Sequence, residues 1–195
     1  MTRQELKAKA KEQIKGNIGI FVLIMLIGSF VSCAAGMIPV VGYMATVIVI
    51  TPAFNIALAT IFLKLTDGIV PEIAEMFQHF NKFWAAFKVI FFTGLFTFLW
   101  SLLLVIPGII KMYSYSMSLY ILAEHPDMPA LEAIERSKKM MDGHKMELFV
   151  LRLSFIGWYL LCAVTCGIAS IYVIPYMRAT MANFYNSVKS EGVLV

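Results

Sequence analysis

Long apolar runs alternate with short charged segments along most of this 195-residue chain. As helices, six of these runs reach about 17–23 residues, close to the ~20 residues needed to cross a ~30 Å hydrocarbon core. They cover residues 18–37, 42–64, 86–106, 107–123, 147–166 and 167–188. The pattern predicts an all-α, polytopic membrane bundle of about six transmembrane helices in three hairpins. The fourth run is the weakest, because 17 helical residues span only about 25 Å.

Composition supports a membrane class. Hydrophobic residues make up 60% of the chain and charged residues 14%, whereas a soluble domain has about 45–50% and about 25%. Mean hydropathy is +0.80. The first apolar run is longer than the apolar core of a cleavable signal peptide, so we expect it to stay as a span.

The distribution of charge predicts orientation. Charged residues are absent from the three short linkers, at 38–41, 105–109 and 165–168. Most of the Lys and Arg residues lie in residues 1–16, 65–85 and 124–146 and near the C-terminus. Because cytoplasmic segments carry the excess of Lys and Arg, we expect a multi-pass protein with both termini in the cytoplasm. The expected organisation is one membrane domain over residues 1–195: an N-terminal amphipathic helix (1–16), a first hairpin (18–64), an interfacial helix with a second hairpin (71–123) and an interfacial helix with a third hairpin (129–188).

Residues 2–16 have the pattern of an amphipathic helix at the membrane surface. Thr2 and Glu5 fit a capping box. Leu6, Ala10 and Ile14 fall on one apolar stripe, and lysines form another, which is typical of a helix on an anionic membrane surface. A plain charged tail that orients the first span would explain most of the same signal.

Residues 71–84 and 129–142 predict two further interfacial helices, because each begins with a proline and carries an apolar stripe. The second stripe is expected at Leu131, Ile134, Lys138 and Met141. The two segments begin at the same distance from a later tryptophan, as a duplicated unit would require. Similar apolar composition alone would explain that likeness equally well.

Two spans repeat a proline followed three residues later by a polar side chain: Pro52 with Asn55, and Pro175 with Arg178. Each proline frees a backbone carbonyl one turn earlier, as in the interrupted helices that line transporter cavities. Arg178 would lie about 16 Å past the preceding turn, with no acidic residue in the predicted spans to pair with it. It either extends to the interface or lines a functional cavity. Packing kinks are the simpler interpretation of the prolines.

The segment 106–126 is unusually polar for a span. On a helix, Lys111, Ser114, Tyr115 and Ser118 share one stripe, which should face the bundle interior. These side chains serve either helix packing, with Lys111 extending to the outer surface, or a polar groove that attracts an anion such as a lipid phosphate.

Motifs for catalysis and for metal or cofactor binding are missing. The three histidines lack further ligands at a known spacing, and no zinc-protease, phosphate-loop or nucleophile-elbow motif occurs. Cys33, Cys162 and Cys166 are expected to be small packing residues. Arg152 is expected to be an interfacial anchor. The sequence therefore predicts a protein that is not an enzyme and that binds no cofactor and no metal ion.

Several separated motifs, in order, carry a family resemblance: "ELKAKAKEQIKGN", "IPGIIKMYSYSMSLYILAEHP", "EAIERSKKMMDGHKMELFVLRLSFIGW" and "PYMRATMANFYN". With these, nearly the whole chain resembles the domain-of-unknown-function 975 family of bacterial integral membrane proteins. The resemblance implies a multi-spanning protein of the bacterial plasma membrane and brings no activity and no catalytic residues.

Two functional hypotheses remain. In the first, the protein transports or handles a lipid or another amphipathic or anionic ligand, in a polar interior lined by Asn55, Lys111, Ser114, Tyr115, Ser118 and Arg178. In the second, it is an accessory, scaffold or immunity-type interaction protein, and the same residues only pack helices. The expected partner is the bilayer, with anionic phospholipids and without nucleic acid. A protein partner or homo-oligomer remains open.

Overall fold

The computed structural model describes residues 2–36, 44, 46–70, 72, 74 and 82–191. All regular elements in these residues are helical, so the predicted all-α class is confirmed for this part of the chain. The elements are α1 (Arg3–Lys15), α2 (Ile18–Gly36), the π-helical turn η1 (Thr46–Ile50), α4 (Thr51–Thr66), α6 (Phe83–Leu103), α7 (Val105–Ser114), α8 (Ser118–Glu124), α9 (Ala130–Met140), α10 (Lys145–Leu153), α11 (Ile156–Val164) and α12 (Ser170–Glu191).

The structure supports fewer spans than the six predicted. Within the described residues, three stretches are long and apolar enough to cross a membrane: Thr46–Thr66, Phe83–Leu103 and Lys145–Val164. A fourth exists only if α1 and the start of α2 count as one span, although they meet at an angle of 85°. A bundle of six spans is therefore not confirmed.

The predicted span 107–123 is two short helices rather than one. α7 has 10 residues and α8 has 7, separated by Tyr115–Met117. The buried Ser137 of α9 accounts for the break: its Oγ accepts from the Met117 amide (3.1 Å) and donates to the Ser114 carbonyl (2.9 Å). These backbone groups find a partner on another helix, so the chain has no need to continue as a straight helix.

The predicted span 167–188 corresponds to α12. This helix is long enough to cross a membrane but is too polar to count among the candidate spans. Its buried face contains Thr180, Asn183 and Ser187 beside apolar residues. Asn183 Nδ2 donates to Gln13 Oε1 of α1 at 2.7 Å, so this polar face serves a contact between helices.

α1 begins as predicted, since the capping box between Thr2 and Glu5 is present. The prediction that its apolar stripe lies on the membrane surface is wrong, however. Leu6, Ala10 and Ile14 are buried at 2%, 0% and 1% exposure, and α1 packs against α12. The stripe is covered by protein and is not available to lipid.

The interfacial helix expected at 129–142 is α9, and half of the predicted stripe is buried, namely Ile134 and Met141. Leu131 and Lys138 are exposed, whereas the face toward the protein is Ala130, Ala133, Ile134, Ser137 and Met140. Most of 71–84 and the linker 38–41 lie outside the described residues.

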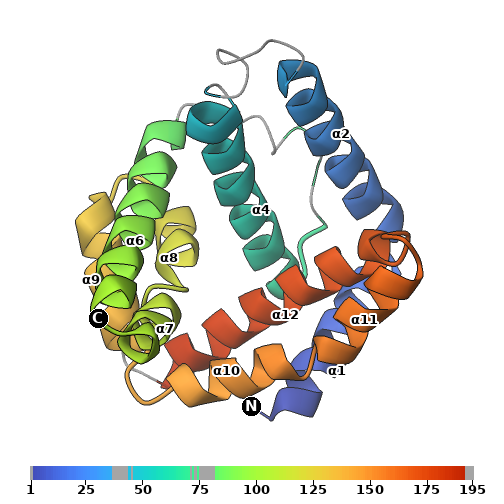
Figure 1. Ribbon diagram of the computed structural model, residues 1–195. Helices are drawn as coiled ribbons and strands as arrows, with labels where there is room; N and C mark the ends of the chain where they lie inside the picture. The colour runs from blue at the N-terminus through green and yellow to red at the C-terminus, as the bar shows by residue number, and fades with distance from the viewer. Residues whose placement is uncertain are drawn as a thin grey trace.

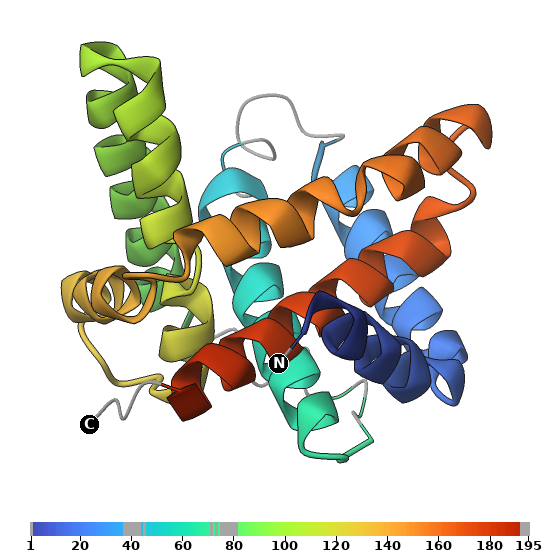
Figure 2. The same cartoon turned by 90° about the horizontal axis from the view of Figure 1, so that it is seen from below.

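The helices are arranged around α4. α4 packs against α6, α8 and α12 and is the most buried of the three long apolar stretches (Figure 1). The α6–α7 hairpin projects from the rest of the molecule, to the same side as the α11–α12 turn, at the upper edge of Figure 2. A Cβ added to Gly108 would lie 2.8 Å from the Ser101 Cα, so the two arms of the α6–α7 hairpin are in close contact.

Candidate functional site

Five helices enclose a cavity of about 380 Å³ that contains two arginines, which we call the two-arginine cavity. α4, α8, α10, α11 and α12 contribute to it. Its polar groups come from Asn55, Ser116, Tyr120, Arg152, Tyr159 and Arg178. The apolar part of its wall is Ala59, Leu119, Leu151, Phe155, Ile174, Met177 and Met181. Among the described residues, no carboxylate lines it.

The two proline–polar motifs meet in this cavity. Arg178 Nη2 donates to Asn55 Oδ1 at 3.1 Å, across 123 positions of sequence. Asn55 Nδ2 donates to the Thr51 carbonyl at 2.9 Å, which turns the amide oxygen toward α12. The π-helical turn η1 ends immediately before α4, whose first turn contains Pro52. Both predicted residues, Asn55 and Arg178, thus belong to one site.

Tyr120 completes the surroundings of Arg178. Its side chain lines the cavity with Arg178 and is almost fully buried. Its ring stacks on Tyr185, with centroids 5.7 Å apart. Tyr185 Oη donates to Glu124 at 2.8 Å, and Lys189 binds the other oxygen of that carboxylate at 2.6 Å. The nearby carboxylate is therefore occupied by groups other than Arg178.

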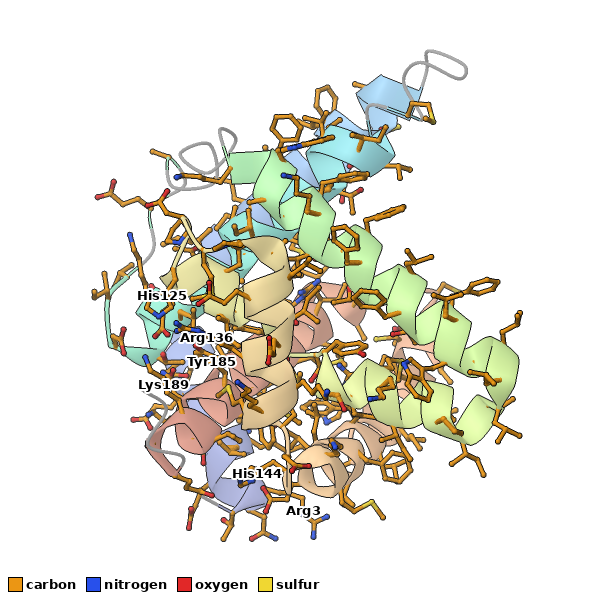
Figure 3. All side chains as sticks on the ribbon, turned by 90° about the vertical axis from the view of Figure 1, so that its left-hand side faces the viewer. Arg3, His125, Arg136, His144, Tyr185 and Lys189 are labelled. Carbon is orange, nitrogen blue, oxygen red and sulfur yellow. The ribbon has the colours of Figure 1, made fainter. Side chains whose placement is uncertain are left out.

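The Glu124 cluster lies at one end of the molecule. Figure 3 shows Tyr185 and Lys189 there with His125 and Arg136. His125 Nε2 is 4.0 Å from Glu124. This end is outside the two-arginine cavity, and its charges are already paired with one another.

Arg152 is the second arginine of the cavity. From the sequence it was expected only to anchor the chain at the membrane interface. Its guanidinium carbon lies 5.2 Å from the centroid of the Tyr113 ring. Arg152 also lines a second hollow of about 520 Å³ between α6 and the α7–α8 segment, which we call the hydroxyl-lined groove. Among the described residues, neither Arg152 nor Arg178 forms an ion pair with a carboxylate. A charged residue inside the apolar run FVLRLSF was the available signal for Arg152.

The other four predicted residues lie elsewhere. Tyr115 and Ser118 line the hydroxyl-lined groove, and Lys111 and Ser114 line a third hollow. Ser114 and Ser118 are buried and donate to carbonyls of their own segment, at 2.9 and 2.8 Å. None of these three hollows joins Lys111 to Arg178. The six predicted residues are thus divided among three hollows.

Two guanidinium groups that face one cavity with apolar walls suit an anion with an apolar part. A set of metal ligands is not found: within the described ranges, no group of three or more His, Cys, Asp or Glu could hold a metal ion. The three cysteines are free thiols.

A protein-family model, described as protein of unknown function (DUF975), matches residues 1–112 and 102–192. The chain belongs to the DUF975 family. This confirms the resemblance inferred from the motifs, and it assigns no activity. No curated protein and no solved structure matches the chain. The function of this DUF975 chain therefore has to be argued from the site itself.

Proposed function

We propose that this chain is a non-enzymatic membrane protein that binds an anionic amphipathic ligand, such as a lipid, in the two-arginine cavity as part of its transport or handling. One observation carries the proposal. Arg178 and Arg152 face the same cavity, and within the described residues they have neutral partners only. An anion from outside the protein would supply the missing negative charge.

The cost of placing these charges favours a ligand role. Arg152 lies within the candidate span Lys145–Val164, and an arginine in the middle of a membrane helix costs about 2.5–3.5 kcal/mol on insertion scales. The hydrogen bond to Asn55 orients the Arg178 guanidinium without neutralising it. A phosphate or carboxylate could bind it with two parallel hydrogen bonds, which are stronger than neutral ones.

The cavity has the dimensions and wall of a small-ligand site. Its volume of about 380 Å³ lies within the ~300–1,000 Å³ typical of ligand pockets. Leu, Ile, Met and Phe side chains opposite the arginines provide an apolar surface for a hydrocarbon segment. This asymmetry favours an amphipathic anion over inorganic phosphate.

A membrane location fits the surface. Apolar side chains of α6, α7 and α11 are exposed, including Phe98 at 61% and Val164 at 82%. A soluble monomer rarely exposes apolar patches of more than a few hundred Å². The family resemblance and the distribution of Lys and Arg support the bacterial plasma membrane, with both termini in the cytoplasm.

The test is native mass spectrometry of the detergent-extracted protein, with Arg178→Gln and Arg152→Gln as variants. Arg136→Gln is the matched control, since Arg136 lies on α9 and pairs with Glu132 at 3.0 Å outside the cavity. We expect the wild type and the control to retain an acidic lipid or similar amphipath, and both cavity variants to lose at least tenfold of it while keeping their unfolding midpoint.

Equal retention by all four proteins would refute the ligand site. Failure of both cavity variants to fold, together with a wild type that carries no bound molecule, would favour the interaction-protein alternative, in which the arginines only hold helices together.

A further inference from the structure

Four lysines converge on the third hollow, of about 400 Å³, which we call the lysine hollow. They are Lys111 of α7, Lys138 and Lys139 of α9, and Lys145 at the start of α10. The one carboxylate in its lining, Asp142, is bonded to Lys145 at 3.2 Å. Within the described residues, Lys111 and Lys138 have no carboxylate partner. The hollow therefore keeps a positive charge that an external anion can neutralise.

Next to this hollow, the α6–α7 hairpin ends in an apolar tip. The five residues from Leu102 to Ile106 are 67–74% exposed. No charged residue occurs between Lys88 and Lys111. Figure 2 shows the hairpin standing apart from the other helices, so the tip has no cover from the described protein.

Distance along the hairpin limits how deeply this tip can insert. Leu104, at the turn, is seven residues from Lys111, which corresponds to about 10 Å of helix. The Lys111 ammonium lies 4.7 Å from the centroid of the Trp100 ring, and tryptophan prefers the membrane interface. One leaflet supplies about half of the ~30 Å hydrocarbon core, or about 15 Å, which exceeds the ~10 Å between Lys111 and the turn.

The lysines fix the level of the interface. Lys138 and Lys139 are exposed on α9, and charged groups in the hydrocarbon core are strongly disfavoured. If the lysine hollow lies among the headgroups, the tip ends within the same leaflet and does not reach the far side.

We propose that α6–α7 is a re-entrant hairpin, which enters and leaves the bilayer through one leaflet while the lysine hollow binds phosphates of anionic phospholipids in that leaflet. This replaces two of the predicted crossings, 86–106 and 107–123. The inference rests on the membrane location proposed above and is independent of the ligand cavity.

Cysteine accessibility tests the insertion. Cys33, Cys162 and Cys166 are first replaced by alanine, and Leu104→Cys or Lys138→Cys is then added singly. Intact cells made permeable only at the outer envelope, and inverted membrane vesicles, are treated with a membrane-impermeant maleimide. We expect Lys138→Cys to react from one side only and Leu104→Cys to react from neither side until detergent is added.

Each other result has a distinct meaning. Labelling of Leu104→Cys from the side opposite Lys138→Cys would show a full crossing and overturn the proposal. Labelling from the same side would show that the tip is not inserted and would overturn it too. Release of the protein from membranes by alkaline carbonate would instead refute the membrane location itself.

Lipid retention tests the lysine hollow. A Lys111→Gln, Lys138→Gln double variant is compared with Lys9→Gln, Lys11→Gln, which removes the same charge from the exposed side of α1. Each lysine near an anionic surface raises lipid affinity about fivefold. We therefore expect the first pair of substitutions to weaken retention of phosphatidylglycerol roughly 25-fold. Equal effects of the two pairs would refute a specific headgroup site.

Discussion

Ser137 offers the sharpest test of how the fold is held together, because its hydroxyl joins three segments. It is fully buried on α9, accepts from the Met117 amide and donates to the Ser114 carbonyl. Ser137→Ala would leave both backbone groups buried without this partner. Each unsatisfied buried group costs about 1–3 kcal/mol, so the loss of both partners should destabilise the variant by about 2–6 kcal/mol.

Two measurements check this. Equilibrium unfolding by sodium dodecyl sulfate in mixed micelles gives the change in free energy, and hydrogen exchange reports the Met117 amide directly. Ser190→Ala is the matched control, since Ser190 is exposed and its hydroxyl bonds only to the Ser187 carbonyl at 2.8 Å. The reasoning is refuted if Ser137→Ala unfolds within about 0.5 kcal/mol of the control and its residue-117 amide exchanges no faster than in the wild type.

Three further changes probe other parts of the structure. Asn55→Asp would place a carboxylate against Arg178, and we expect native mass spectrometry to show loss of bound anion with the fold intact; unchanged binding would contradict the ligand role. Leu6→Ala should cost about 2–5 kcal/mol in the same unfolding assay, because a buried leucine leaves a cavity, whereas Leu131→Ala on the exposed side of α9 should be nearly neutral. Gly108→Ala should lower the unfolding midpoint by the equivalent of about 1–3 kcal/mol, since its methyl group would collide with backbone across the hairpin; an unchanged midpoint would show that the arms can separate freely.

Local sequence signals predicted the parts of the site that depend on local chemistry. The proline–polar spacing identified Asn55 and Arg178 because each polar side chain follows the proline of its own helix by about one turn. The capping box of α1 was predictable for the same reason. That the two motifs would bind each other depends on the packing of α4 against α12, which no single segment encodes.

The errors arise where a distant partner decides the outcome. Hydropathy predicted one span over 107–123, whereas the break at Tyr115–Met117 is stabilised by Ser137, about twenty residues further along. Periodicity likewise found the stripe of α1 and could not tell whether lipid or protein covers it. The cavity that Arg152 lines is formed by residues of α4, α8, α10, α11 and α12 together. The sequence around Arg152 alone could not reveal it, so the residue was assigned to the interface.

The contact between α1 and α12 joins the first and the last of the described helices, with about 155 residues between them. A ribosome adding about 5–20 residues per second needs roughly 8–30 seconds to make that stretch. During this time the stripe of Leu6, Ala10 and Ile14 lacks the cover that α12 provides. A membrane surface is the nearest apolar phase, so α1 is suited to rest there while the chain is being made and to exchange lipid for α12 at the end. A chain truncated before α12 should therefore leave α1 exposed to proteases or chaperones.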